Sequence, residues 1–164
     1  MLISYITSQQ MKIPRISALI EELAKRKGRK IQLEEHTLYT FPAADKLAEL
    51  SEADLKEIGF GYRAPYIAKV AQDFANKELM LEALRSLSTA EARKYLRVLP
   101  GVGEKVANCV CLFGFGKTDA FPVDTWIEKA NKEFYDGKLT AELFGENAGI
   151  AQQYIFYYIR STQA

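Results

Sequence analysis

The chain contains few of the residues that build metal centres and disulfide bonds. Its 164 residues include two cysteines and one histidine. Cys109 and Cys111 are two positions apart, a spacing that does not suit a disulfide bond within one helix or strand. Together with His36 they cannot form a four-ligand zinc site or a four-cysteine iron–sulfur cluster, so the sequence predicts no metal centre. His36 is most simply a surface loop residue.

Long hydrophobic runs are also missing. No apolar run approaches the roughly 18 to 20 residues that a membrane span needs, and Met1 is not followed by a signal-peptide pattern. Hydrophobic residues make up 48% and charged residues 26% of the chain, which is a globular balance. We therefore expect one soluble domain over residues 1–164, with no membrane partner. The expected location is the cytoplasm, beside the nucleoid if the source is bacterial.

The net charge of +1 hides an uneven distribution of charge. Residues 1–30 carry seven Lys or Arg against two Glu, a local charge of +5, and residues 93–117 carry five against one, a local charge of +4. Residues 31–61 carry seven acids against two bases, a local charge of −5. The basic blocks could face a phosphate backbone together or could be solvated helix faces, so charge alone leaves both interpretations open.

Helical signals run through most of the chain. Apolar spacings of three and four predict a helix over 13–24, and helices are also expected from Ser51 to Gly59, from Gly61, and from a capping box at Ser88. The residues expected on their inner faces are Leu55, Ile58, Tyr66, Ile67, Val70, Phe74, Tyr95, Leu96 and Leu99. No alternating strand pattern of useful length is present. The predicted class is all-α.

A Pro-Gly segment over 99–103 separates the helix that starts near Ser88 from the next one. Proline stops the first helix, and the glycines permit a tight turn before a new helix starts near Gly103. Amide N–H groups at such a turn point outward with the positive end of the helix dipole behind them, and Val102 at the tip places no polar side chain in the way. A DNA phosphate fits this turn, although most Pro-Gly-x-Gly tetrapeptides are turns alone.

Two further residues have the chemistry of a reaction at a sugar carbon. A nucleophilic amine must be neutral, and a lysine at a helix N-terminus in a partly desolvated cleft, as expected of Lys105, has its charged form disfavoured. Cleavage of a glycosidic bond builds positive charge on the sugar, which a carboxylate such as Asp124 can stabilise. Asp124 could instead cap the helix that starts at Thr125, and the residues alone leave both interpretations open.

Four segments resemble one enzyme family. Leu99-Pro100-Gly101-Val102-Gly103-Glu104-Lys105-Val106-Ala107 and Phe121-Pro122-Val123-Asp124 are similar to the helix-hairpin-helix DNA glycosylases, among them the 8-oxoguanine DNA glycosylase branch. Gly59-Phe60-Gly61-Tyr62-Arg63-Ala64 resembles the segment with which those enzymes wedge open the duplex. Ala148-Gly149-Ile150-Ala151-Gln152-Gln153-Tyr154-Ile155-Phe156 resembles their C-terminal pocket helix. These segments occur in the family's order and extend over most of the chain.

The resemblance implies a fold, a reaction and a partner. The fold is the all-α helix-hairpin-helix glycosylase fold, with two helical lobes and a cleft between them. The hairpin motif would cover about 88–114, the catalytic Asp loop 118–124 and the pocket helix about 147–161. The reaction is removal of 8-oxoguanine from duplex DNA by a base-excision repair glycosylase that is also an AP (β-) lyase. We expect a monomer without a cofactor, and the sequence leaves open whether a monovalent cation binds the hairpin carbonyls.

The resemblance also assigns roles to residues. In the family, the lysine at the position of Lys105 attacks the deoxyribose C1′, expels the damaged base and holds the sugar as a Schiff base, while the aspartate at the position of Asp124 supports the reaction. The flipped base would be held by Cys109, Gln152 and Phe156. The DNA contacts would come from Gly101, Val102 and Gly103 in the hairpin, from Tyr62 as a wedge, and from Arg15, Arg63 and Gln10 near the orphaned cytosine. Taken singly, Cys109 and Phe156 are more simply core residues, and each arginine is more simply in contact with phosphate or solvent.

The sequence departs from the family pattern in three places. Ser8-Gln9-Gln10 stands where the family has an Asn-rich stretch, which predicts looser selectivity for cytosine. Trp126 stands where some relatives have histidine. The resemblance begins almost at Met1, whereas a β-sheet domain precedes this region in many members, so we expect a form without that domain. The alternative function is therefore a catalytically weak or inactive helix-hairpin-helix DNA-binding module or fragment. The presence of Lys105 and Asp124 argues against this alternative.

Overall fold

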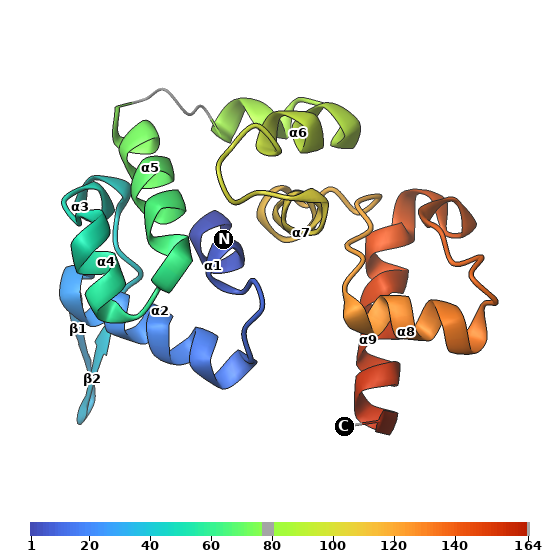
Figure 1. Cartoon of the computed structure of the whole chain (residues 1–164), viewed down its shortest axis with the longest axis horizontal. Helices are drawn as coiled ribbons and strands as arrows, with labels where there is room; N and C mark the ends of the chain where they lie inside the picture. The colour runs from blue at the N-terminus through green and yellow to red at the C-terminus, as the bar shows by residue number, and fades with distance from the viewer. Residues whose placement is uncertain (77–80, 164) are drawn as a thin grey trace. The chain divides into compact units, whose positions relative to one another are not determined.

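The computed structural model describes residues 1–76 and 81–163, and most of their regular structure is helical (Figure 1). The α-helices of these residues are α1 (Leu2–Thr7), α2 (Ile13–Lys27), α3 (Ala44–Ala48), α4 (Glu52–Ile58), α5 (Ala64–Ala75), α6 (Thr89–Leu96), α7 (Glu104–Phe115), α8 (Thr125–Phe134) and α9 (Ala148–Gln163). Short 3₁₀ turns are η1 (Gly61–Arg63), η2 (Leu81–Arg85), η3 (Ala141–Leu143) and η4 (Gly145–Asn147). No helix in the described residues is both long and apolar enough to cross a membrane.

The chain folds into two compact units. The N-terminal unit comprises Leu2–Glu82 and the short segment Leu99–Gly101, and the C-terminal unit comprises Met1, Ala83–Val98 and the chain from Val102 onward. The hairpin between α6 and α7 contributes residues to both units.

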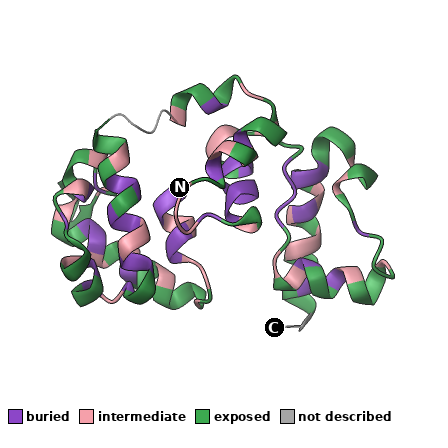
Figure 2. Ribbon diagram, turned by 45° about the horizontal axis from the view of Figure 1, so that its top comes forward, coloured by how far each residue is buried: buried purple, intermediate pink, exposed green. Residues whose placement is uncertain are grey.

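The core of the N-terminal unit forms where α3 and α4 pack on α5 and where α1 packs on α2 and α5. Its completely buried side chains include Ile6, Leu19, Leu23, Leu55, Phe60 and Ile67. Each such side chain contributes roughly 1.5 to 3 kcal/mol by leaving water. Along α2 and α5 the buried residues alternate with exposed ones (Figure 2), whereas α7 of the C-terminal unit is buried at every position from Val106 to Leu112.

The C-terminal unit is built from two helix pairs, α6 with α7 and α8 with α9. Phe121, Ile127, Leu139 and Ala148 form a buried cluster beneath α8 and α9. At Gly149, a Cβ atom would lie 2.4 Å from the carbonyl oxygen of Ala120 and 2.6 Å from Leu112. Only glycine therefore lets the start of α9 approach the end of α7 and the loop that carries Asp124.

The helix starts predicted from capping residues are confirmed. Ser51 accepts a hydrogen bond from the backbone N–H of Asp54, whose carboxylate accepts one from the Ser51 backbone, and Ser88 and Glu91 form the same reciprocal box. The predicted end of α4 is confirmed as well, because Gly59 adopts a left-handed conformation with φ of 109°.

A two-stranded hairpin is the main departure from the predicted all-α class. β1 (Lys30–Leu33) and β2 (His36–Tyr39) are antiparallel, with Ile31 opposite Leu38, so His36 lies in a strand rather than in a loop. Both strands are exposed along their whole length, so neither has the buried face that produces alternation. Their turn contains no glycine, asparagine or proline, and Glu34 supplies the left-handed conformation.

Two further predictions about helices were wrong. Phe74, expected on the inner face of α5, is 39% exposed, whereas Ile67 and Val70 are buried as predicted. Helix α6 ends at Leu96 rather than at Pro100, and Arg97 is its C-cap. Leu99 therefore belongs to the hairpin turn and not to the helix.

Candidate functional site

Glycine occupies the two hairpin positions, 101 and 103, for different structural reasons. Gly101 has φ of +75°, and a Cβ atom there would lie 2.6 Å from the ring of Tyr66. Gly103 is the N-cap of α7 in an extended conformation, with open space around its missing Cβ and no side-chain capping bond. Gly101 is thus required by both conformation and packing, whereas Gly103 leaves the first amides of α7 uncovered by a side chain.

The side chain of Val102 does not lie at the tip of the hairpin. It is 6% exposed and belongs to the core, whereas the sequence predicted it at the tip of the turn. A DNA contact at this position can therefore involve only the backbone. The physical reason is that the seven-residue connection between the packed helices α6 and α7, residues 97–103, needs an apolar anchor, and valine is the apolar residue in Gly-Val-Gly.

A salt-bridge network that sequence reasoning missed fixes the start of α7. The Glu104 carboxylate accepts from Arg93 Nη1 at 3.2 Å and from Arg97 Nη1 at 2.9 Å. Asn108, which is buried, donates from Nδ2 to the backbone oxygen of Glu104 at 3.0 Å and to its Oε1 at 3.1 Å. Two of the basic residues that gave this region its predicted positive charge are therefore partly neutralised within the protein.

Lys105, Cys109 and Asp124 lie close enough to influence one another. The Cys109 thiol is 4% exposed, and burial raises its pKa to about 11. The charge of Lys105 and a hydrogen bond between the two side chains act in the opposite direction, while the negative charge of Asp124 raises the pKa further. Helix α7 brings Lys105 and Cys109 to one face because they are four residues apart, and the segment before α8 brings in the carboxylate.

Asp124 is a helix cap, as one of the two sequence interpretations predicted. Its Oδ1 accepts from the backbone N–H groups of Trp126 at 3.0 Å and Ile127 at 2.9 Å. Both capping bonds use the same oxygen. The cap holds the half-buried carboxylate in a fixed orientation.

Two of the residues predicted to hold a base, Gln152 and Phe156, lie on α9. Gln152 is 2% exposed, and its Oε1 accepts from Gln153 Nε2 at 2.5 Å. Phe156 is half-buried against the cluster under α8 and α9, with the Arg160 guanidinium 5.9 Å from its ring centre. Both project from α9 one turn apart, and both belong to the same unit as Lys105.

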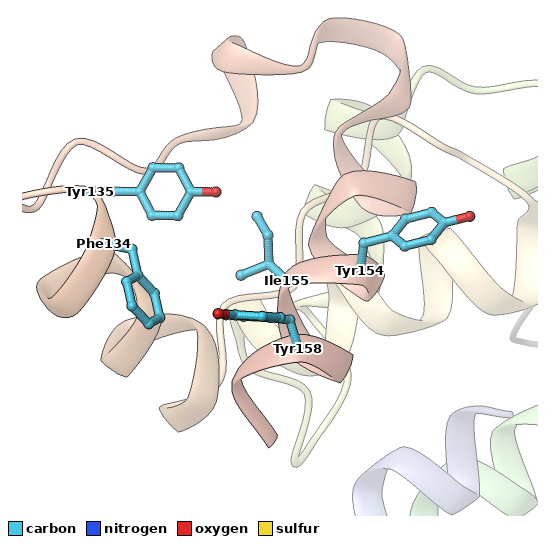
Figure 3. A pocket seen from close by; sticks show the side chains of 5 residues that line it. All are labelled: Phe134, Tyr135, Tyr154, Ile155 and Tyr158. Atoms are coloured by element: carbon cyan, nitrogen blue, oxygen red, sulfur yellow. The ribbon is translucent and has the colours of Figure 1, made fainter. Parts of the chain in front are cut away.

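A separate hollow of about 360 Å³ opens between α8 and α9 (Figure 3). Phe134, Tyr135, Tyr154, Ile155 and Tyr158 line it, and Phe134 meets Tyr158 edge to face with ring centres 6.0 Å apart. None of these five is a predicted base-pocket residue. The sequence signal that could have found the hollow is the density of aromatic residues in α9.

The predicted wedge segment lies in the N-terminal unit. Tyr62 is exposed, whereas Arg63 is 6% exposed and donates to backbone carbonyls, from Nε to Gln9 at 3.1 Å and from Nη1 to Phe60 at 3.4 Å. The Arg63 guanidinium is therefore not open to a base in this structure, and its donation to cytosine stays a prediction. Arg15 is exposed and lies over Gly59, where a Cβ atom would come within 2.5 Å of its Nη2. Gln10 is exposed with φ of 49°.

Known proteins resemble this chain over nearly its whole length. A probable N-glycosylase/DNA lyase of Methanothermobacter thermautotrophicus is 31% identical over 96% of this chain and 59% of its own. The N-glycosylase/DNA lyase OGG1 of Arabidopsis thaliana is 34% identical, over 94% of this chain and 48% of its own. The crystal structure of the Clostridium acetobutylicum 8-oxoguanine glycosylase/lyase, in complex with double-stranded DNA containing cytosine opposite 8-oxoguanine, is 36% identical and superposes with a TM-score of 0.93 over 99% of this chain.

The chain spans about half to three-fifths of the length of these relatives. The superposition on the Clostridium structure confirms the predicted helix-hairpin-helix glycosylase fold. Residues 3–142 match the family described as the HhH-GPD superfamily of base excision DNA repair proteins. That match includes the hairpin, Lys105 and Asp124, and the chain belongs to this superfamily.

Proposed function

We propose that the chain is a DNA glycosylase with AP lyase activity that removes 8-oxoguanine from duplex DNA. The observation that carries the proposal is the grouping of an amine, a buried neutral thiol and an oriented carboxylate at Lys105, Cys109 and Asp124. The similarity to relatives named N-glycosylase/DNA lyase, and to a structure of an 8-oxoguanine glycosylase/lyase on DNA, supports it.

The proposed reaction begins at the neutral amine of Lys105. Its lone pair forms a bond to the deoxyribose C1′, the bond from C1′ to the damaged base breaks, and the base departs with that electron pair. The attached nitrogen then loses a proton to water, and the C1′–O4′ bond breaks. Its electron pair goes to O4′, which takes up a proton from water, and a protonated Schiff base joins Lys105 to the sugar. Removal of a proton from C2′ then breaks the C3′–O bond by β-elimination, with the 3′ phosphate as the leaving group.

Asp124 would act through its charge. Positive charge develops on the sugar as the base leaves, and a carboxylate already fixed in place stabilises that charge without having to reorganise. The two capping bonds to Oδ1 supply this fixed orientation. The reaction uses the chain's own amine and carboxylate, so we propose that it requires no cofactor.

The partner in this proposal is duplex DNA that contains a damaged base, bound by a monomer in the cytoplasm. The uncovered amides at the start of α7 are suited to a backbone phosphate, and the exposed ring of Tyr62 is suited to fill a vacated position in the base stack. Gln152 and Phe156 would offer a polar edge and a flat wall to the flipped base.

Borohydride trapping tests the proposal directly. The protein is incubated with a duplex that carries 8-oxoguanine opposite cytosine, and borohydride reduces any Schiff base to a stable covalent adduct. We expect an adduct with wild type, none with Lys105→Gln, and none with the undamaged duplex. A wild-type protein that binds the duplex and gives no adduct would instead be a DNA-binding module without catalytic activity.

A further inference from the structure

Five residues of the N-terminal unit form a closed ring of contacts. Gln9, in the loop between α1 and α2, donates from Nε2 to the backbone oxygen of Gly101 in the hairpin at 2.7 Å. The backbone oxygen of Gln9 accepts from Nε of Arg63 at 3.1 Å and also from its Nη2. One glutamine therefore joins two segments that are 92 and 54 residues away along the chain.

Aromatic contacts complete the ring. The Arg63 guanidinium lies 4.3 Å from the ring centre of Tyr62. The rings of Tyr62 and Tyr66 meet edge to face, with their centres 6.5 Å apart and their planes at 78°. Tyr66 then packs against Gly101, at the position where a Cβ atom would overlap its ring. The contacts thus run from the hairpin through Gln9, Arg63, Tyr62 and Tyr66 back to the hairpin.

We propose that Gln9 is a positioning residue that links the hairpin to the ring orientation of Tyr62. The proposal rests on the proposed function, in which the hairpin holds a phosphate and Tyr62 enters the base stack. Tyr62 is half exposed, and an exposed ring with no fixed neighbours samples several rotamers. Here Arg63 and Tyr66 limit those rotamers, and Gln9 orients Arg63 relative to Gly101.

The loop geometry supports a dedicated role for Gln9. Gln10, the next residue, has φ of 49°, which is uncommon for a residue other than glycine. This turn lets the Gln9 carbonyl face Arg63 while its side chain reaches the hairpin. Arg63 is buried and Gln9 is half-buried, so water competes poorly for these bonds. In this proposal, Arg63 holds the ring of the wedge residue Tyr62 in place in the DNA-free protein.

The test measures duplex opening with 2-aminopurine placed next to a stable abasic-site analogue, because its fluorescence rises when the base unstacks. Gln9→Met keeps about the length of the side chain and removes its amide, including the donor to Gly101. Gln9→Glu keeps an oxygen acceptor and lacks the donor, and it is a second variant if the first does not fold. Gln72→Ala, an exposed glutamine on α5, is the matched control. At saturating protein we expect the equilibrium constant for opening to fall about fivefold in Gln9→Met and not at all in the control.

A double variant separates positioning from a general structural effect. Tyr62→Leu removes the wedge ring, so adding Gln9→Met to it should cause no further loss of opening. Normal opening by Gln9→Met would overturn the proposal, and so would losses that multiply in the double variant.

The same assay distinguishes this proposal from the proposed function. A wild-type protein that opens the duplex and forms no borohydride adduct refutes the glycosylase and lyase activities and leaves the role of Gln9 intact. A wild-type protein that does not unstack the base refutes the wedge and the role of Gln9 together.

Discussion

Substitution of Asp124 by asparagine and by alanine separates its two roles. The structure shows the capping role, since Oδ1 accepts from two backbone N–H groups at 2.9 and 3.0 Å. Asparagine keeps an oxygen at this position and is as good an N-cap as aspartate, so Asp124→Asn should retain both bonds. Alanine removes them. Only the negative charge is missing from the asparagine variant, whereas the alanine variant lacks both the charge and the cap.

The expected magnitudes differ enough to be measured. Loss of an N-cap costs about 1 kcal/mol, which corresponds to a fall in Tm of about 2 to 4 °C for a chain of this size. Loss of a fixed charge that stabilises a developing cation typically slows the reaction on the order of 100-fold. Asp124→Asn should therefore keep the wild-type Tm and lose about 100-fold in rate, and Asp124→Ala should lose both.

The assays are single-turnover base release and thermal melting, done side by side on the three proteins. Ser51→Ala is the matched control, because it removes the N-cap of α4 and should lower Tm by a similar amount without slowing the reaction. A fully active Asp124→Asn variant would refute the catalytic role and leave Asp124 as a cap alone. A control that is as slow as Asp124→Ala would show that instability, and not charge, sets the rate.

Three further outcomes are expected. Lys105→Gln should abolish both base release and the trapped adduct while leaving DNA affinity, measured by fluorescence anisotropy, within a small factor. Gly101→Ala should lower Tm by at least about 2 °C, because the φ of +75° and the Tyr66 ring both oppose a Cβ atom. It should also weaken binding to damaged and undamaged duplex alike. Gly103→Ala meets no such strain. At pH 8, Cys109 should be alkylated about 100-fold more slowly in the folded than in the unfolded protein, as followed by mass spectrometry, because burial raises its pKa from 9.0 to about 11 and so disfavours the reactive thiolate.

The features that the sequence predicted well depend on residues close together in the chain. A capping box needs only residues three apart, and those at Ser51 and Ser88 fixed the starts of α4 and α6. Lys105 and Cys109 are one helical turn apart, so their proximity required only that α7 exist. The cap formed by Asp124 lies within three residues of it.

The features that the sequence did not predict depend on contacts between distant segments or on burial. The β1–β2 hairpin has no buried face, so no hydrophobic periodicity marks it. The exposure of the Phe74 side chain depends on which helices cover α5. Hydrophobic periodicity identifies an apolar stripe on a helix but not the element that packs against it. In each case tertiary structure decides between local alternatives of similar energy.

Charge shows the same limit at the candidate site. Residues 93–117 carry a local charge of +4 when every basic residue is counted alike. In the structure, Arg93 and Arg97 both bind Glu104, so they stabilise the join between α6 and α7. Arg63 is likewise buried among backbone carbonyls, while Arg15 stays exposed. A buried base must exchange its partners before it can contact DNA, whereas an exposed one need not, so we expect Arg15 rather than Arg63 to make the immediate contact.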